Sequence, residues 1–423
     1  MIYKKLILIL LLTFEYLYAV DAQIDIVRKN SIIPSISVNV VSSTLKKDLI
    51  LKIKNVVVKD LEVSSHFIIK HTQVDLKDIN ENIETLNNKN LDLILYLSVL
   101  ENNTSNITVQ SKLIDLNKKE IILNKKYIIS SESRYPFLGH KIAVNVNDNL
   151  KAPSIKWMER FIIFSRYTSS RKSEIVVSDY TLKYQKVVVR GGLNLFPKWA
   201  NKEQNSFYYT SYSGTFPTLF KQNLFTSKSK EIISSQGMMV CSDVSFKSNK
   251  ILLTMAPTGQ PDIYVYDLDS KIKRKITKYK GIDVGASFVD NETSIVFISD
   301  RLGKANVFSK KINRDGVDRL VYHGKNNSQA TTHNNYIVYS SRETNNEFSK
   351  NAFNLYLIST KNDMIKRLTV NGVNKFPKFS NDGESILFTK NYKNKSYVGI
   401  VRLNYDKSFL FKLDIGKLQS IDW

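Results

Sequence analysis

The chain is poor in the residues on which disulfide-stabilised folds and many catalytic centres depend. Its 423 residues include one cysteine, Cys241, and five histidines. A single cysteine cannot close a disulfide within the chain, and Cys241 has no histidine or second cysteine near it in the sequence, so we interpret it as a structural thiol. A chain of this length can bury cores that need no disulfide, which leaves export to an oxidising compartment open.

Long apolar stretches are also scarce. An apolar run near the start, from Leu6 to Leu12, follows two lysines and precedes the small residues Ala19 and Ala22. This pattern is typical of a secretory signal peptide, and the run is far shorter than the about 20 apolar residues that cross a bilayer. We therefore predict a signal peptide over residues 1–22, cleaved after Ala19 or Ala22, with a retained membrane anchor as the alternative. No later stretch has the length and apolarity of a transmembrane segment.

Acidic residues are outnumbered by basic ones. With 62 Lys and Arg against 39 Asp and Glu, the formal net charge is +23. Such a charge would suit a nucleic acid or another anionic surface. The lysines, however, are scattered among asparagines in the loops and are not gathered in one stripe with aromatic residues. We interpret them as a solvated surface and expect no nucleic-acid partner, while attraction to acidic partners stays open.

Motifs of catalysis and cofactor binding are missing as well. The sequence has no G-x-S-x-G, no H-E-x-x-H, no P-loop and no glycine-rich dinucleotide fingerprint. His66 and His71 have a spacing that does not stack them on one helical face, so we interpret them as surface histidines and not as a metal pair. We expect no enzymatic activity and no cofactor.

Three carboxylates are candidates for a cation in a central channel. Asp243, Asp300 and Asp382 lie near expected turns or strand starts. Turn stabilisation accounts more simply for Asn381-Asp382-Gly383, which is a typical turn triplet. We favour the turn interpretation and keep a channel ion as the alternative.

An internal repeat is the strongest feature that the sequence does contain. From about residue 155 onward, aromatic residues open successive units at a nearly even spacing, with one degenerate start near His333. These residues are Trp157, Trp199, Phe246, Phe288, Phe379 and Trp423. Each unit has about four short β-branched and aromatic strands separated by Gly, Pro, Asn and Asp turns, which is typical of propeller blades. We predict an all-β six-bladed β-propeller over residues 151–423, with a β-sandwich array as a minor alternative.

The last residues predict how the ring closes. Residues 419–423 repeat the opening of a unit, and then the chain stops. A four-stranded blade has two apolar faces that it can bury only against neighbouring blades, so the units must close into a ring. We expect the tail to add the innermost strand of the first blade and to bury Trp423.

Residues 23–150 have a different pattern, which predicts a compact α/β domain with an extended N-terminal arm. Apolar residues recur at i, i+4 spacing over Leu45–Leu61, which predicts a helix. We also expect an extended segment at 32–38, a helix at Ile79–Leu86, strands at Leu93–Leu97, Lys112–Leu116 and Tyr127–Ile129, and a closing helix at Lys141–Val146. The predicted fold class is therefore an α/β N-terminal domain plus an all-β six-bladed β-propeller.

Loops around the mouth of a rigid propeller favour recognition over chemistry. We expect the residues just before each innermost strand to converge on one mouth and to bind a partner protein. These candidates are Asn194, Leu195, Ser242, Asp243, Val284, Gly285, Thr331, Thr332, Asn374 and Lys375.

Several blade motifs resemble those of a known family. Phe196-Pro197-Lys198-Trp199 and the segment 376–383 are similar to the F-P-x-W-S-P-D-G blade starts of TolB proteins. Further matches are Ser178-Asp179-Tyr180, Ser299-Asp300-Arg301-Leu302-Gly303 and Lys366-Arg367-Leu368-Thr369. The sequence departs from the family where Pro-Asp-Gly is lost in most blades, and where Val240 replaces a mouth histidine.

The N-terminal region carries the same resemblance. Asp60-Leu61 with Ser64-Ser65-His66-Phe67 is similar to the family's D-L-x-x-S-G-x-F, and residues 138–143 are similar to its A-H-x-I-A segment. The resemblance therefore spans nearly all of the chain after the signal peptide.

The resemblance implies a periplasmic adaptor of the Tol-Pal system, which maintains outer-membrane integrity and supports envelope constriction at cell division. It implies that the lipoprotein Pal binds at the propeller mouth and that the C-terminal domain of TolA binds the N-terminal arm. Other outer-membrane proteins are implied as further partners, and the chain itself as a monomer. The arm would comprise Gln23, Ile24, Asp25, Ile26 and Val27, a β-prone segment suited to strand addition. Its state would then report Pal occupancy to TolA.

Two other classes of function stay open. The 22 tyrosines and the basic charge suit an exported propeller that binds cell-wall polysaccharide. A propeller lyase or glycosidase would need paired acidic residues that converge in the channel.

Overall fold

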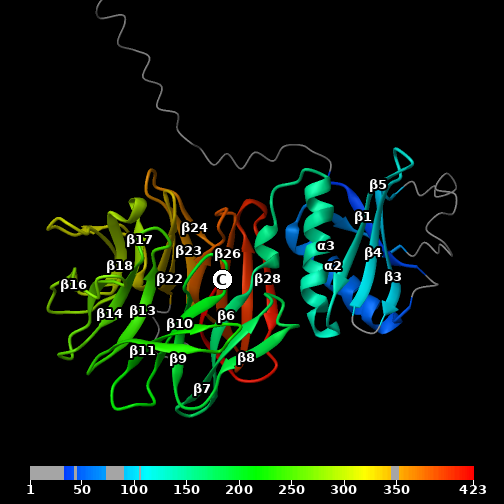
Figure 1. The fold of residues 1–423 in the computed structure, drawn as a ribbon. Helices are drawn as coiled ribbons and strands as arrows, with labels where there is room; N and C mark the ends of the chain where they lie inside the picture. Colours follow the sequence, from blue (N-terminus) through cyan, green and yellow to red (C-terminus); the bar gives the residue numbers. More distant parts are fainter. Residues whose placement is uncertain (1–32, 42–44, 73–89, 104–105, 344–351) are drawn as a thin grey trace, which may run out of the picture. The chain divides into compact units, whose positions relative to one another are not determined.

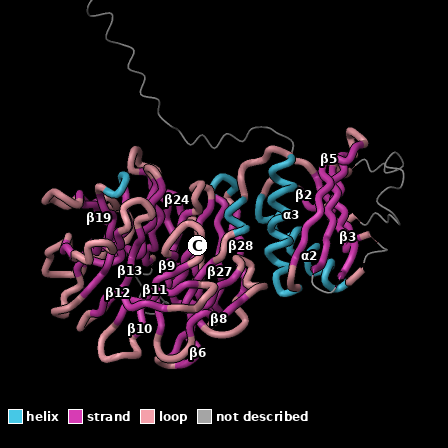
Figure 2. The backbone as a smooth tube through the Cα atoms, viewed as in Figure 1, coloured by secondary structure: helices cyan, strands magenta, loops and turns pink. Residues whose placement is uncertain are grey.

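The structure, a computed structural model, describes residues 33–41, 45–72, 90–103, 106–343 and 352–423. Helices and a mixed sheet form an α/β domain at the start of this range, and a β-propeller follows (Figures 1 and 2). The predicted signal peptide, the arm at 23–27 and the predicted helix at Ile79–Leu86 lie outside the described residues. None of the helices in the described ranges is both long and apolar enough to cross a membrane.

The α/β domain has a five-stranded sheet in the order β2-β1-β3-β4-β5. The strands are β1 (Ser35–Val40), β2 (Ile68–Ile69), β3 (Leu93–Asn103), β4 (Asn106–Asp115) and β5 (Glu120–Ile129). β1 is parallel to β2 and β3, whereas β3, β4 and β5 form an antiparallel meander. The predicted strands at Leu93–Leu97, Lys112–Leu116 and Tyr127–Ile129 correspond to β3, β4 and β5, each of which is longer than predicted, although β4 ends at Asp115.

Two helices complete the core of this domain. α2 (Lys47–Ser64) confirms the helix predicted at Leu45–Leu61, and its apolar face packs with the sheet in one cluster that includes Ile53, Leu95 and Ile142. α3 (Tyr135–Asn149) is longer than the helix predicted at Lys141–Val146. It starts earlier because Pro136 lies in its first turn, where the fixed φ of proline favours a helix start.

The propeller has six four-stranded antiparallel blades, as predicted. Blade 1 comprises β29 (Lys417–Asp422), β6 (Ile162–Ser169), β7 (Lys172–Ser178) and β8 (Gln185–Val189); blade 2 comprises β9 (Asn194–Trp199), β10 (Ser206–Ser211), β11 (Thr218–Asn223) and β12 (Ser229–Ser234); blade 3 comprises β13 (Met239–Val244), β14 (Lys250–Met255), β15 (Asp262–Asp267) and β16 (Lys273–Lys275). Blade 4 comprises β17 (Asp283–Val289), β18 (Ser294–Ser299), β19 (Asn306–Lys311) and β20 (Asp318–Arg319); blade 5 comprises β21 (Lys325–His333), β22 (Tyr336–Arg342), β23 (Phe353–Ser359) and β24 (Ile365–Arg367); blade 6 comprises β25 (Val373–Phe379), β26 (Ser385–Tyr392), β27 (Lys395–Arg402) and β28 (Lys407–Lys412). Blades 5 and 6 are joined by one parallel bridge between Phe353 and Val373.

The C-terminal strand closes the ring. β29 pairs with β6 in antiparallel register from Lys417↔Tyr167 to Asp422↔Ile163, which confirms the predicted closure. Trp423 is only partly buried, contrary to prediction, because it lies beyond the last strand pair. Its indole N–H still donates to the Phe379 carbonyl at 2.8 Å.

The aromatic markers of the repeat are out of phase in three blades. Trp199 pairs with the second residue of β10, and the residues at the same register in blades 1, 3 and 5 are Asp422, Val244 and Thr332. Phe246, predicted to open blade 3, lies in the turn after β13 and is 50% exposed. The prediction failed there because the position that pairs with the second strand holds Val244, and the nearest aromatic residue comes two positions later.

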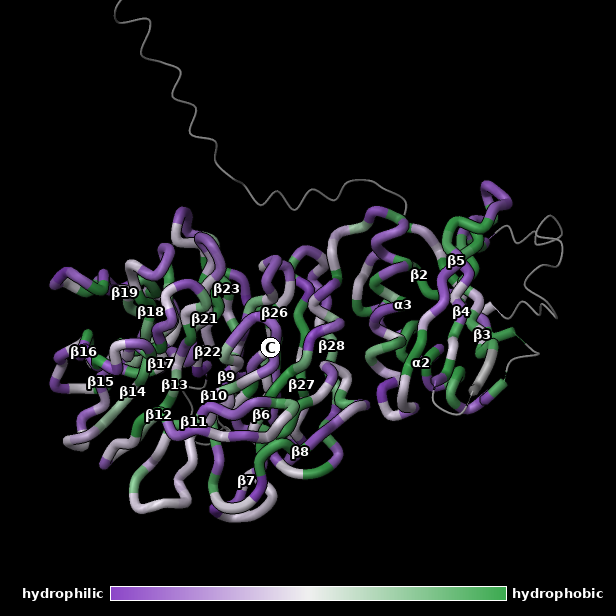
Figure 3. Tube along the Cα trace, viewed as in Figure 1, coloured by the Kyte–Doolittle hydropathy of each residue, from purple (hydrophilic) through white to green (hydrophobic). Residues whose placement is uncertain are grey.

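Apolar residues are concentrated on the strands and polar residues in the turns (Figure 3). Buried clusters join each blade to its neighbours, as ring closure requires. Cys241 lies in the cluster shared by blades 2 and 3, and burial raises the pKa of its thiol. A buried, protonated thiol fits the predicted structural role.

A buried polar cluster joins the α/β domain to blade 1. We call Asp60 of α2, His140 of α3, and Asp179 and Tyr180 after β7 the interdomain cluster; all four side chains are buried. His140 Nδ1 lies 2.6 Å from Asp60 Oδ2, and its Nε2 lies 3.3 Å from Asp179 Oδ2. The Tyr180 hydroxyl donates to the second oxygen of Asp60. Burial alone would lower the pKa of His140, but the attraction of the two carboxylates raises it to about 10.

A second buried group holds the same two parts together. The guanidinium of Arg402, at the end of β27, donates to Ser385 Oγ at 2.8 Å and lies 3.3 Å from His66 Nε2. His66 Nδ1 lies 2.5 Å from the Asn147 side-chain oxygen. Burial lowers the pKa of His66 to about 4, so the neutral ring donates to Asn147 and accepts from Arg402. The prediction that His66 is a surface histidine is therefore wrong, because folding places it under blade 6.

Candidate partner-binding site

The first strands of the six blades form a continuous inner ring. β9 contacts β13, β13 contacts β17, β17 contacts β21, β21 contacts β25, and β29 contacts both β25 and β9. Each first strand pairs with the second strand of its own blade across a β-bulge. A bulge increases local twist and re-aims the side chains beside it, which is why bulges recur at functional rims.

The backbone at these bulges takes an unusual conformation. Phe196, Gln329 and Phe376 have positive φ angles, and so does Gly285, at 63°. Only glycine adopts this region without steric cost. The Phe-Pro-Lys triplets at 196–198 and 376–378 each place the strained phenylalanine at the bulge and a lysine directly after it.

The residues after the bulge share one register. Lys198, Asp243, Ser287, Thr331 and Lys378 each pair with the third residue of their second strand. Asp422 of β29 lies beside them, because its carboxylate contacts both Lys198 and the Trp199 backbone N–H. We call Lys198, Asp243, Lys378 and Asp422 the charged layer.

Lys198 bridges the two carboxylates of the charged layer. Its Nζ lies 3.0 Å from Asp422 Oδ1 and 3.4 Å from Asp243 Oδ1. Burial alone would lower the pKa of Lys198, yet the two carboxylates raise it above its usual value. Lys378 has the opposite balance: burial, and then repulsion by Lys198, lower its pKa to about 8. The layer therefore carries one firmly held ammonium and one that an added negative charge would stabilise.

Side chains of the inner ring also tie neighbouring blades together. Asp422 Oδ2 accepts from the Trp199 N–H at 3.0 Å, and Asp243 Oδ2 accepts from the Phe288 N–H at 2.9 Å. The Gln329 side-chain oxygen accepts from the Phe376 N–H at 3.0 Å in the same way. Part of this polar lining therefore holds the ring closed.

The structure places the predicted mouth residues in two groups, one on each side of the β-bulge of the first strands. All ten lie within the first strands, so the prediction that they precede the strands is wrong. Leu195, Val284 and Lys375 pair with the fifth residue of their second strands, on the far side of the bulge from Asp243 and Thr331. Asn194, Gly285 and Asn374 lie next to the first group, and Ser242 and Thr332 next to the second. The strand repeats are regular, but the sequence shows no bulge, and the candidates were therefore taken from mixed registers.

Burial further separates these candidates. Asn194, Leu195, Thr331 and Asn374 are buried, whereas the other six are half-buried or exposed. The side-chain NH2 of Asn374 lies within hydrogen-bond distance of the Phe353 and Asn371 carbonyl oxygens and of the Asn354 side-chain oxygen, which fits a role in shaping the strand start. Sequence reasoning missed Lys198, Lys378 and Asp422, although the repeated Phe-Pro-Lys triplet was a signal for the first two.

Lys375 is the most distinctive side chain among the residues that precede the bulge in their strands. It is half-buried, and its Nζ lies 4.7 Å from the centre of the Phe353 ring. Burial, and then repulsion by Lys417, lower the pKa of Lys375. Within the described residues, neither lysine forms an ion pair with a carboxylate. This end of the inner ring therefore offers positive charge to an acidic group.

The other chemical candidates do not come together as a catalytic or metal site. Asp300 Oδ1 accepts from the Ile282 N–H and so joins the end of β18 to the chain before β17, whereas Asp382 Oδ1 accepts from the Glu384 N–H and serves a turn, as expected. No three His, Cys, Asp or Glu side chains are grouped to hold a metal ion in the part of the chain that the structure describes. Asp243 and Asp422 both lie beside Lys198, and each has one oxygen in an ion pair with the Lys198 ammonium and the other accepting from a backbone N–H. This arrangement suits the joining of blades better than acid–base chemistry, which needs one carboxyl free to give a proton.

Comparisons with known proteins agree with this architecture. A family model described as the TolB beta propeller domain matches residues 159–404. The Tol-Pal system protein TolB of Wolinella succinogenes is 45% identical over 99% of this chain and 100% of that protein. The protein of the same name from Campylobacter jejuni is 43% identical, again over 99% and 100%.

A solved structure has the same fold. The crystal structure of TolB from Acinetobacter baumannii matches with a TM-score of 0.75 and 18% sequence identity, covering 92% of this chain and 96% of that one. At this identity the match concerns the fold alone.

Proposed function

The chain belongs to the TolB family, and we propose that it acts in the periplasm as a non-enzymatic adaptor of the Tol-Pal system that links Pal to TolA. The observation that carries this proposal is the similarity to Tol-Pal system TolB proteins, which are 45% and 43% identical over 99% of this chain. In this role the chain would help to maintain outer-membrane integrity and support envelope constriction at division. The predicted signal peptide at 1–22 would direct its export.

We infer that Pal binds at the end of the inner ring that carries Lys375. The half-buried ammonium of Lys375 lies near Lys417, and neither has a carboxylate partner in the described chain. Exposed Gly285 and half-buried Val284 lie on the same side of the bulge. A carboxylate from Pal would relieve the repulsion between the lysines and would gain a partly desolvated ion pair, which contributes more than an exposed one.

Calorimetric titration with the soluble domain of Pal from the same organism tests this proposal. The chain starting at residue 23 should bind one Pal domain, and Lys375→Glu should weaken binding by about tenfold or more. Lys395→Glu is the matched control, because Lys395 is an exposed lysine at the start of β27 in the same blade. Equal effects of the two variants on the Kd would contradict a Pal site at Lys375. The absence of any Pal binding would contradict the adaptor role.

The N-terminal arm, Gln23–Val27, is proposed to bind the C-terminal domain of TolA by strand addition. A chain that starts at residue 28 should then lose TolA binding and keep Pal binding. If Pal occupancy controls the arm, adding the Pal domain should change the Kd for TolA. An unchanged Kd would contradict the coupling while leaving both binding sites in place.

A further inference from the structure

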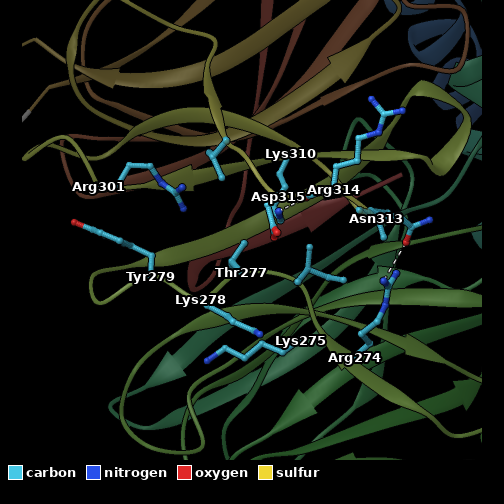
Figure 4. Close-up of a pocket in the computed structure, with 13 residues that line it drawn as sticks. Arg274, Lys275, Thr277, Lys278, Tyr279, Arg301, Lys310, Asn313, Arg314 and Asp315 are labelled. Atoms are coloured by element: carbon cyan, nitrogen blue, oxygen red, sulfur yellow. Dashed lines mark hydrogen bonds between the residues drawn. The ribbon is translucent and has the colours of Figure 1, made fainter.

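A basic pocket lies between blades 3 and 4, away from the inner ring. It has a volume of about 500 Å³ and is lined by the end of β16 and the residues after it, by Arg301 after β18, and by Lys310 of β19 with the chain between β19 and β20. Figure 4 shows these side chains around the open space. Six of them are basic: Arg274, Lys275, Lys278, Arg301, Lys310 and Arg314. Asp315 is the acidic side chain in the lining.

Two of the basic side chains already have partners. Lys275 Nζ lies 2.6 Å from Asp262 Oδ2, and Arg301 Nη2 lies 3.0 and 3.1 Å from the two oxygens of Asp283. The Arg301 guanidinium is further fixed by aromatic contacts, 5.2 Å from the centre of the Tyr279 ring. Arg301 is therefore held rigidly at the edge of the pocket before any ligand arrives, which reduces the entropy lost on binding.

The other four basic groups carry charge without a carboxylate partner. No ion pair within 4.0 Å joins Arg274, Lys278, Lys310 or Arg314 to an acidic side chain of the described residues. Arg274 donates to the Asn313 side-chain oxygen at 3.0 Å, which is a neutral acceptor. Together with Asp315, these groups leave a clear surplus of positive charge around one concave space.

Lys310 distinguishes this pocket from an ordinary solvated basic face. It is 9% exposed, and its Nζ donates to the Arg314 carbonyl oxygen. A lysine side chain that is buried to this extent normally has a counter-charge near its ammonium. An anion in the pocket would supply the negative charge that Lys310 lacks. Lysines on an exposed surface are solvated by water and need no such counter-charge.

We propose that the basic pocket binds a phosphate-bearing anion. Guanidinium groups match the oxygens of phosphate through paired N–H donors, and lysines add point charge. A space of about 500 Å³ is within the usual range of roughly 300–1,000 Å³ for small-ligand sites. Positive groups from both blades suit a ligand with more than one negative charge. The proposal does not depend on the adaptor role, because the pocket is separate from the inner ring.

Titration with inorganic pyrophosphate tests the pocket directly. The triple variant R274A/K278A/R314A removes three exposed charges and should weaken pyrophosphate binding by at least about tenfold, since each lost charge-assisted contact contributes strongly. The control K186A/K230A/K407A removes three exposed lysines elsewhere on the propeller and should bind as the wild type does. Equal weakening in both variants, or no binding by the wild type, would overturn the proposal.

The buried lysine gives a second, independent measurement. Lys310→Met should abolish the rise in melting temperature that pyrophosphate causes in the wild type, while the variant without ligand should melt no lower than the wild type. A variant that melts much lower and keeps the pyrophosphate effect would show that Lys310 serves only the fold.

Vesicles distinguish two sources of the phosphate. Co-sedimentation with phosphatidylcholine vesicles that contain phosphatidylglycerol, lost in R274A/K278A/R314A and displaced by pyrophosphate, would identify a lipid headgroup as the ligand. Pyrophosphate binding without co-sedimentation would identify a free phosphate compound. Co-sedimentation that the triple variant retains, together with unchanged pyrophosphate binding, would contradict the site.

Discussion

Replacing His140 with alanine is expected to destabilise the protein by about 3–5 kcal/mol, because it leaves two buried carboxylates without their counter-charge. His140 lies 2.6 Å from Asp60 and 3.3 Å from Asp179, and all three side chains are buried. The surrounding groups raise the pKa of His140 from its ordinary 6.5 to about 10. The raised pKa means that the folded state favours the charged ring, which is the same direction as the expected loss on replacing it.

The raised pKa of His140 also determines how the free energy of unfolding depends on pH. A group whose pKa is raised in the folded state contributes its full stability below its unfolded pKa and loses it as pH rises through the folded pKa. For His140 the contribution is therefore complete below about pH 6.5 and is lost by about pH 10. The difference in unfolding free energy between wild type and His140→Ala should shrink across this window.

Urea unfolding of the chain from residue 23, at several pH values from 6 to about 10, measures this difference. His71→Ala is the control, because His71 is exposed and should have little effect. Adding Asp60→Asn to His140→Ala should recover part of the loss, since one unpaired carboxylate is removed. A loss below about 1 kcal/mol at pH 6, or a loss that does not change with pH, would refute the reasoning.

Three further predictions concern the propeller. Deleting residues 418–423 removes most of β29 and its pairing with β6, so the melting temperature should fall sharply and by more than in Asp422→Asn; an unchanged melting temperature would contradict closure by this strand. Gly285→Ala should cost about 1–2 kcal/mol, because φ is 63° there and the added methyl group meets nothing within 4 Å, whereas Gly214→Ala, with ordinary φ, should cost much less; equal losses in urea unfolding would point to another cause. Lys378 has its pKa lowered to about 8, so the unfolded chain binds more protons between pH 8 and 10.5, and the wild type should gain stability relative to Lys378→Met as pH rises through this range; parallel urea-unfolding curves would be incompatible with the assigned repulsion.

Local sequence patterns were sufficient for the architecture. The i, i+4 apolar spacing located α2 to within a few residues, and the repeat of short strands gave six blades and the closing tail. Such patterns work because each element must present an apolar face with its own period. They failed at Phe246, because the strand position that holds an aromatic residue in blades 2, 4 and 6 holds Val244 in blade 3, and Phe246 lies in the turn beyond it.

The candidate site was predicted less well. Asp243 and Lys375 were identified, but on opposite sides of a bulge that no local pattern shows. Lys198 and Lys378 were noticed only as parts of a blade motif. His66 was assigned to the surface because the sequence does not show that Arg402 and Asn147 enclose it.

The sequence by itself determined the periods: which segments are helices, which are strands, how many blades there are, and that the last strand completes the first blade. Only the tertiary structure decided which polar groups meet, because ring closure and domain packing bring together residues far apart in the chain. Lys198 and Asp422 are 224 positions apart and form an ion pair. The positive charge of His140 is balanced by two carboxylates, one 80 residues before it and one 39 residues after it. The short-range period of apolar residues indicates which positions are buried and where turns occur. The electrostatics of a site depend instead on distances that arise only when the ring closes and the two domains pack.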